Sequence, residues 1–493
     1  MDVTIYVFSY MAIIVLLYFK TSLFISQYYD AKRMLILEKQ KYQEWNKEII
    51  NIIPFGLLLV SIGFIWYSPI IANTLLFVAL LIEIINSKKI LFKCTRRSIT
   101  LLLFSSLLPL ICLFNINIIS YCLVSVVILF NSFITILANY ILLPIEMLIR
   151  YHYIKQAKNK IKKASNLKII AITGSYGKTS FKNYLYTLLY GKYNVLKTPG
   201  SVNTPLGICK FINNNLTPYE DILIVELGVD APNTMKKFFK MFTPTIGVVT
   251  AIGEMHLATF KTIANIQKEK LSLFDEVSDK KGIFYNNDSP YMDLKSEHKK
   301  NATSYSIEDV NNIVVTIEGT YFTYKGIKCF VNLLGKHQLT NLIGAIKVAE
   351  YLKLPMEYII KRLALIKAEP HRMSVTKGTT TIIDDSYNAN FVGLSEAINI
   401  INTFKGKKGI ILNGIIEAGE SSDKQNYEIG KLLTHFNEIV ILSSTNEKLM
   451  EALDKAKKRY KKFDEYRDGI SYLKKKKLDY ILLCSRAEKD FIK

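Results

Sequence analysis

A short glycine-containing loop in the middle of the 493-residue sequence carries the residues best suited to bind phosphate. The loop and its continuation comprise Gly174, Ser175, Tyr176, Gly177, Lys178, Thr179 and Ser180. Glycines let the backbone curl so that N–H groups point at phosphate oxygens. Lys178 is expected to reach the terminal phosphates of a nucleotide, and the Thr179 hydroxyl to bind Mg²⁺. The gap between the glycines is two residues shorter than in the usual P-loop, and the alternative is a plain glycine turn with a surface lysine.

The segments around this loop predict a parallel sheet that would position it. Residues 167–173 read as a buried strand and residues 181–190 as a helix, so the loop would lie at a helix N-terminus, where partial positive charge favours anions. A second strand over 222–225 ends at Glu226, and a third over 245–250 is followed by His256. Groups at the carboxyl ends of parallel strands face the ligand crevice. Glu226 is therefore a candidate Mg²⁺ ligand, directly or through water; His256 taken alone is more often structural.

Seven ordered motifs together resemble the Mur ligases, the cytoplasmic amide ligases that build the peptidoglycan stem peptide. They are T-G-S-Y-G-K-T-S (173–180), T-P-G-S-V-N-T-P-L-G (198–207), V-E-L-G (225–228), V-V-T-A-I-G-E-M-H-L (248–257), G-K-H-Q-L-T-N (335–341), H-R-M (371–373) and I-D-D-S-Y-N-A-N (383–390). The last motif is most similar to the family type that adds D-alanyl-D-alanine. The resemblance extends over about residues 165–430.

The resemblance implies an ATP-dependent, ADP-forming ligase. A substrate carboxylate would attack the γ-phosphate of ATP and become an acyl phosphate, which the amine of an amino acid or dipeptide then attacks. Such an enzyme contributes positioning and charge neutralisation rather than a covalent nucleophile.

The resemblance also assigns roles to individual residues. Lys178, His256 and Lys270 become the catalytic candidates, and Thr179, Glu226, His256 and Lys270 the metal site. Lys270 matches a lysine carbamylated by CO₂, whose oxygens suit Mg²⁺, although Lys268 is close enough to leave the register open. The nucleotide would further contact Asn341, Arg372 and Asp385; the substrates would contact Asn203, Thr204, Tyr387, Asn388 and Asn390.

The first third of the chain is far more apolar than the rest. Apolar runs cover about residues 3–24, 52–67, 70–85, 99–114 and 118–149, lengths that predict about five transmembrane helices. Lysines and arginines in alternate loops predict that the catalytic part is cytoplasmic, in a multi-pass cell-membrane protein that contacts lipid. A buried helical core of a soluble domain is the alternative.

The expected fold is α/β in three parts. Transmembrane helices occupy residues 1–150, a central P-loop parallel-sheet ATPase domain 151–370, and a smaller Rossmann-like α/β domain 371–493. Residues 367–370 read as the hinge between the last two, and residues 314–334 alternate as antiparallel strands do. A membrane region in place of a sugar-binding domain leaves open whether the acceptor is UDP-linked or lipid-linked.

Composition excludes other classes. The net charge is +22, but the lysines are spread over the chain without an aromatic-rich basic motif, so no nucleic-acid partner is expected. The six cysteines form no C-x-x-C pair, which argues against a metal or redox site. A membrane transporter or sensor with a regulatory nucleotide-binding domain and an inactive scaffold remain the alternatives to a ligase.

Overall fold

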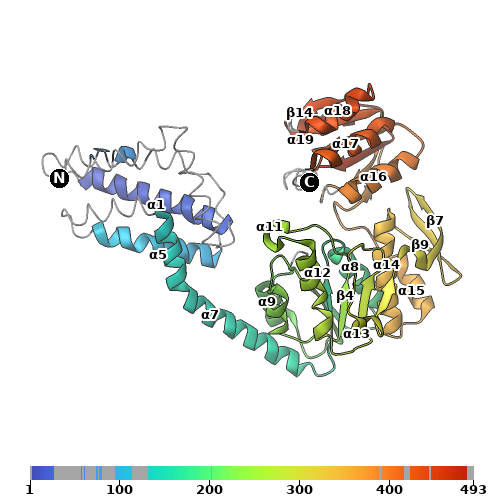
Figure 1. Cartoon of the computed structure of the whole chain (residues 1–493), viewed down its shortest axis with the longest axis horizontal. Helices are drawn as coiled ribbons and strands as arrows, with labels where there is room; N and C mark the ends of the chain where they lie inside the picture. Colours follow the sequence, from blue (N-terminus) through green and yellow to red (C-terminus); the bar gives the residue numbers. More distant parts are fainter. Residues whose placement is uncertain are drawn as a thin grey trace. The chain divides into compact units, whose positions relative to one another are not determined.

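The chain divides into two compact units, Met1–His152 and Tyr153–Lys493. The computed structural model describes residues 3–26, 57, 60, 74–75, 77–79, 81, 95–113, 131–200, 202–387, 391–415, 422–442 and 446–485 (Figure 1). The predicted domain boundary at residue 370 falls between the two large sheets of the second unit, and the division into domains stays a prediction.

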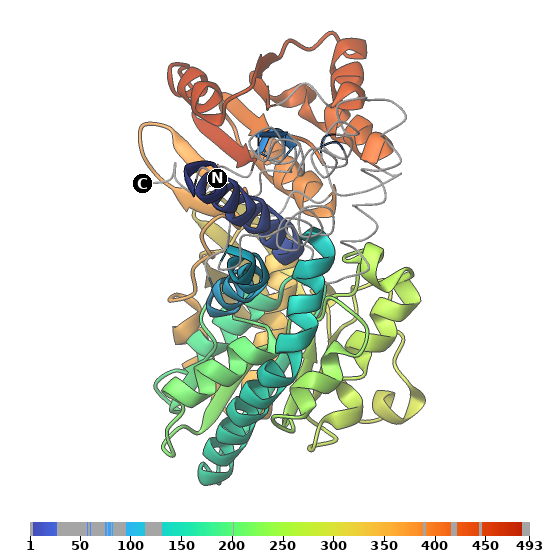
Figure 2. The same cartoon turned by 90° about the vertical axis from the view of Figure 1, so that its left-hand side faces the viewer.

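The described part of the first unit is helical. It contains α1 (Val3–Ser26), α5 (Arg96–Leu113) and most of α7 (Asn131–Lys163), which continues into the second unit (Figure 2). Phe24, Leu101 and Ile136, one from each helix, meet in a small apolar core. Beside it, Arg97 forms an ion pair with Glu146 at 2.6 Å, which ties α5 to α7.

The predictions of a multi-pass membrane protein and of a cell-membrane location are wrong. Within the described residues, one helix, Ser132–Lys163, is long and apolar enough to cross a membrane, and a single such helix is weak evidence because buried core helices meet the same criterion. The runs at 52–67 and 70–85 lie largely outside the described residues. Leu16 and Leu17 of α1 are 1% and 0% exposed, so these two apolar side chains are buried within the protein. The predicted lipid partner loses its support with the spans.

A six-stranded parallel sheet forms the centre of the second unit. Its strands are β1 (Lys168–Thr173), β2 (Val195–Lys197), β3 (Ile222–Glu226), β4 (Ile246–Val249), β5 (Ile283–Asn286) and β6 (Thr303–Tyr305), in the order β2-β3-β1-β4-β5-β6. All neighbours pair in parallel. The carboxyl ends of β3, β1 and β4 therefore lie side by side, which is where such sheets bind ligands.

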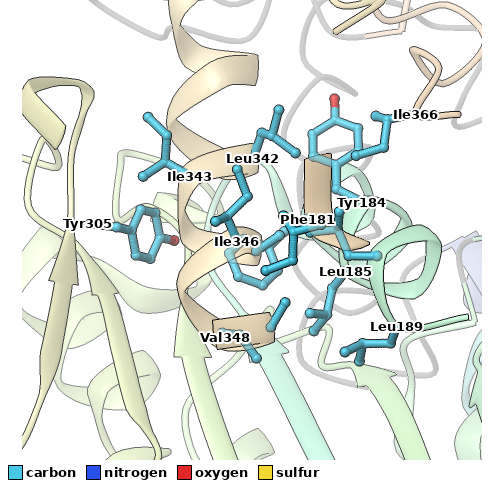
Figure 3. Close-up of a cluster of buried hydrophobic side chains, with 14 of the residues drawn as sticks. Phe181, Tyr184, Leu185, Leu189, Tyr305, Leu342, Ile343, Ile346, Val348 and Ile366 are labelled. Atoms are coloured by element: carbon cyan, nitrogen blue, oxygen red, sulfur yellow. The ribbon is translucent and has the colours of Figure 1, made fainter. Parts of the chain in front are cut away.

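Helices cover both faces of this sheet because side chains alternate along each strand. Ile170 and Ile172 of β1 pack in a core with α8 (Lys178–Leu189) and α14 (Lys336–Tyr351). Figure 3 shows Phe181 and Leu185 of α8 close to Leu342 and Ile346 of α14. Ile169 and Ala171 pack on the other face. Helices α9 (Pro205–Asn215), α10 (Thr234–Phe239) and α12 (Ile263–Leu271) cover that face. The end of α7 also packs there.

Shorter elements complete the central part. They are α11 (Leu257–Phe260), η3 (Phe274–Glu276), α13 (Ser296–Lys299), η4 (Ile307–Asp309) and α15 (Met356–Leu363). A separate antiparallel sheet contains β7 (Val310–Thr316), β8 (Gly319–Tyr324) and β9 (Ile327–Val331), as the alternation over 314–334 predicts.

A second six-stranded sheet follows residue 370. Its strands are β10 (Ser374–Thr376), β11 (Thr381–Asp384), β12 (Lys408–Leu412), β13 (Glu438–Leu442), β14 (Lys461–Phe463) and β15 (Tyr480–Cys484), in the order β10-β11-β15-β12-β13-β14. Only the β10–β11 pairing is antiparallel among these described strands. The helical elements around it are α16 (Phe391–Thr403), α17 (Ser422–Leu432), η6 (Leu433–His435), α18 (Glu447–Lys455) and α19 (Tyr466–Lys474). The α/β class predicted for this half is confirmed.

Candidate active site

The predicted phosphate-binding loop lies between the end of β1 and the first turn of α8. Gly174 and Gly177 have φ angles of +152° and +81°, which glycine adopts at little cost. A Cβ on Gly174 would lie 2.1 Å from Thr250 Oγ1, and one on Gly177 would lie 2.6 Å from Asn341 Nδ2. Space and backbone conformation both require glycine here, and the first-turn amides of α8 lie at the loop, where they suit an anion.

The segment after β4 holds the loop in this shape. Ser175 N donates to Ala251 O at 2.6 Å, and Gly253 N donates to Ser175 Oγ at 3.0 Å. Thr250 Oγ1 donates to Tyr176 O at 2.5 Å. The Ser175 side chain therefore fixes the loop to its neighbour, and the nucleotide-binding role predicted for Ser175 stays a prediction.

Replacing Gly174 with alanine is expected to destabilise the protein by about 2–5 kcal/mol, the sum of an unfavourable φ and a steric clash. The control is Gly326→Ala, because Gly326 also has a positive φ, +79°, but a Cβ there meets nothing within 4 Å. Chemical denaturation should show a loss of only about 1–2 kcal/mol for the control. Equal losses for the two variants would contradict the close packing of the loop.

Lys178 is the first residue of α8, and its ammonium group lies against the preceding phosphate-binding loop. Nζ donates to Gly174 O at 2.7 Å and to Ser175 O at 3.3 Å. Burial lowers the pKa of Lys178 to about 8; Glu226 opposes this shift and Arg372 adds to it. The group is still mainly cationic at pH 7, as a partner for phosphate oxygens must be.

Glu226, at the carboxyl end of β3, connects three elements although it is only 2% exposed. Its Oε2 accepts from Thr179 Oγ1 at 3.0 Å and from Lys182 Nζ at 2.9 Å. Its Oε1 accepts from Asn203 Nδ2 at 3.2 Å. Burial alone would raise the pKa of Glu226, but the charge and hydrogen bond of Lys182, with Lys178 and Asn203, lower it. The carboxylate is therefore ionised, as a metal ligand needs to be.

Lys182 was not among the residues selected from the sequence. It is 0% exposed, and the signal that could have identified it is its place four residues after Lys178, on the same face of α8. Ser180, between them, is 5% exposed in the first turn of the helix.

Lys270 on α12 is the buried lysine of its pair, since it is 2% exposed whereas Lys268 is exposed. Its Nζ donates to Gly174 O at 3.2 Å and to Val229 O at 3.3 Å, which places it at the phosphate loop. Burial and the nearby Lys178 lower the pKa of Lys270 to about 7. The geometry favours Lys270 over Lys268 as the candidate for carbamylation, which needs a neutral amine.

His256 is placed differently. It is an exposed residue with a φ of +60° at the N-cap of α11. Its segment starts at Ala251 and Gly253, which bind the phosphate loop. Its predicted metal-binding role stays a prediction.

Asn341 and Arg372 approach the loop from other parts of the chain. Asn341, on α14, is 8% exposed and packs against Gly177. Gln338, one turn earlier, donates to Arg372 O at 2.9 Å and accepts from the Tyr184 hydroxyl of α8. Arg372 is close enough to lower the pKa of Lys178, so the segment between α15 and β10 that carries Arg372 lies near the loop.

The conformation around Arg372 is unusual. His371 and Met373 on either side have φ angles of +66° and +53°, a costly region for residues other than glycine. Hydrogen bonds hold them: His371 Nδ1 lies 2.8 Å from Asp384 Oδ2, and Met373 N donates to Asp385 Oδ1 at 3.2 Å. Asp385, predicted to contact the nucleotide, thus also orients the segment that presents Arg372.

The predicted substrate residues are dispersed. Asn203 joins Glu226, whereas Thr204 caps α9 by accepting from Gly207 N at 3.2 Å. Tyr387 is 40% exposed, and the Arg372 guanidinium lies 4.2 Å from the centre of its ring. Asn388 and Asn390 lie outside the described residues. The structure therefore gathers the loop, Lys178, Thr179, Asn203, Glu226, Lys270 and Asn341 in one place, with Arg372 near them.

Comparisons with known proteins find similar ligases. The Mur ligase middle domain matches residues 172–349. A UDP-N-acetylmuramoyl-tripeptide--D-alanyl-D-alanine ligase of Bacillus subtilis is 27% identical over 279 residues, which are 54% of this chain and 60% of that protein. One from Buchnera aphidicola is 27% identical over 350 residues, 67% of this chain and 75% of that protein. The chain thus spans about 60–75% of the length of these relatives.

Solved structures share the fold. MurF from Acinetobacter baumannii matches with a TM-score of 0.60 at 22% identity, over 68% of this chain and 78% of that one. MurF ligase from Thermotoga maritima in complex with ADP matches with a TM-score of 0.57 at 26% identity, over 67% and 79%.

Proposed function

We propose that this chain is an ATP-dependent, ADP-forming ligase of peptidoglycan precursor synthesis, because residues 172–349 match the Mur ligase middle domain. The proposed acceptor is a UDP-N-acetylmuramoyl-tripeptide and the proposed amine is D-alanyl-D-alanine, the substrates named for its relatives. The observation that carries the proposal is the contact of Thr179 with Glu226 at 3.0 Å, directly beside a glycine loop that ends in Lys178. This arrangement suits the binding of a nucleotide with Mg²⁺.

The proposed reaction has two steps. A carboxylate oxygen of the acceptor attacks the γ-phosphorus of ATP, the bond to the β,γ-bridging oxygen breaks, and ADP leaves. The amine then attacks the carbonyl carbon of the acyl phosphate, loses a proton, and orthophosphate leaves with the former carboxylate oxygen. The activation is needed because a free carboxylate resists attack by an amine.

The chain supplies charge and position in both steps. Lys178 presents a cation to the phosphate oxygens, and the backbone of the Gly174–Gly177 loop presents N–H groups. Arg372 adds a second cation, on a segment that the hydrogen bonds of His371 and Met373 hold in place. Preorganised charge of this kind costs no rearrangement as the phosphoryl group is transferred.

The residues present fit a magnesium ion. Thr179 and Glu226 offer hard oxygen ligands side by side. Among the described residues, three hydrogen bonds occupy three of the four acceptor positions of the ionised, buried carboxylate. Bound Mg²⁺ would neutralise charge on the phosphate oxygens. A carbamate on Lys270 would add two further oxygens at the loop.

The test is ADP release by the purified full chain. We expect release that depends on the acceptor and product formation that depends on the dipeptide as well. A chain that releases no ADP with any UDP-N-acetylmuramoyl-peptide would contradict the proposal, and release that ignores the acceptor would point to a plain ATPase.

A further inference from the structure

The most deeply buried charged group near the loop is Lys182, for which the proposed reaction has so far no use. The Lys182 side chain is 1% exposed and forms an ion pair with the side chain of Glu226, which is 3% exposed. Its Nζ also donates to Gly200 O at 2.9 Å. A lysine that is fully enclosed, with one charged and one carbonyl partner, is an uncommon choice for a helix that packs on a sheet.

Stability alone does not explain this lysine. Removing two charges from water costs several kcal/mol, and apolar residues of similar size often replace a buried ion pair without loss of stability. Six other residues of α8 are buried, among them the apolar Phe181 and Leu185, so an apolar side chain at position 182 would match the rest of this buried face. We therefore look for a functional reason for a positive charge at position 182, next to Glu226.

The partners of Lys182 belong to two different segments. Gly200 lies in the 198–204 segment, of which the structure describes residues 198–200 and 202–204. Asn203, in the same segment, donates from Nδ2 to the other oxygen of Glu226. Asn203 O in turn accepts from Gly228 N at 2.7 Å, two residues after Glu226. The 198–204 segment is thus tied twice to the carboxylate that also holds Thr179.

We propose that Lys182 is a positioning residue that couples the 198–204 segment to the Thr179–Glu226 pair, so that acceptor and magnesium nucleotide bind interdependently. The inference rests on the proposed function, in which Asn203 lies near the acceptor. When the segment shifts on acceptor binding, Gly200 O and Asn203 Nδ2 move with it. Asn203 Nδ2 acts directly on Oε1 of Glu226, and Gly200 O acts on Oε2 through Lys182. Lys182 keeps the carboxylate oriented while this happens.

The first measurement uses the unaltered chain. Calorimetric titration with Mg²⁺ and a non-hydrolysable ATP analogue, with and without the UDP-linked tripeptide, should show nucleotide binding at least about 5-fold tighter when the acceptor is present. Equal affinities would overturn the inference without any variant. Absence of acceptor-dependent ADP release would instead remove the proposed function.

Variants then locate the coupling. Lys182→Met should abolish the difference between the two titrations, and should raise both the KM for the acceptor and the Mg²⁺ needed for half-maximal rate by about 10-fold, with the KM for the dipeptide unchanged. Lys210→Met, an exposed lysine of α9, is the matched control and should behave as the unaltered chain. Lys182→Arg, which keeps the charge, should restore part of the coupling.

Asn203→Ala provides a route that leaves the helix untouched if Lys182→Met does not fold. This variant removes the hydrogen bond from Asn203 Nδ2 to Glu226 Oε1. It should therefore also reduce the difference in nucleotide affinity with and without the acceptor. Coupling that survives both Lys182→Met and Asn203→Ala would overturn the inference.

Discussion

Replacing Lys178 with methionine is expected to lower kcat by about 1,000-fold or more, because the charge nearest the transferred phosphoryl group is lost. The fold should survive. Burial lowers the pKa of Lys178 from 10.5 to about 8, so the folded protein holds this proton less tightly than the unfolded chain does. The ammonium group therefore costs stability below pH 8, and this cost disappears above pH 10.5.

The measurements are single-turnover ADP formation and thermal unfolding at pH 7. The variant should lose activity while its midpoint of unfolding stays equal or rises, since methionine removes a buried charge. Lys210→Met controls for the general loss of a lysine, because Lys210 is exposed. A Lys178→Met protein that binds and hydrolyses ATP as the unaltered chain does would show that the loop is an ordinary glycine turn.

Lys270 is expected to carry a carbamate, and the enzyme is expected to lose about 100-fold or more of its activity when Lys270 becomes methionine. CO₂ reacts only with a neutral amine. Burial lowers the pKa of Lys270 to about 7, so the neutral form dominates above pH 7 and the ammonium form below it. Carbamate formation should therefore rise as the pH passes upward through about 7.

The readout is a carbamate signal in the ¹³C NMR spectrum of protein kept in ¹³C-labelled bicarbonate. Lys268→Met is the matched control, since Lys268 lies on the same helix two residues away but is exposed. The signal should vanish in Lys270→Met and persist in Lys268→Met. The reverse pattern would show that the lysine assigned from the family resemblance is displaced by two positions.

Much of the central sheet could be predicted because each signal is local. The apolar run at 167–173 became β1, the run at 222–225 became β3, and glycines marked the turn between strand and helix. Glu226 could be selected as a candidate metal ligand because a carboxylate at the carboxyl end of a buried parallel strand faces the ligand crevice.

Other features depend on contacts between distant segments. Lys182 sits in a helix rich in lysine and aromatic residues, and only Glu226 and Gly200, on other segments, reveal that it is buried. The positive φ angles of His371 and Met373 depend on hydrogen bonds to β11 and the residue after it, which no local pattern encodes.

The membrane prediction failed for a related reason. Apolar length alone does not distinguish a helix in lipid from a helix packed among others, and Leu16, Leu17 and Phe24 of α1 are buried in the protein. Burial against neighbours is a property of the fold rather than of the run of residues.

The central claim is that the acceptor carboxylate becomes an acyl phosphate. It is tested most directly with acceptor labelled with ¹⁸O in both oxygens of the reacting carboxylate. We predict that one labelled oxygen appears in each orthophosphate released and one remains in the amide product. Unlabelled orthophosphate, formed together with the ligated product, would contradict the account.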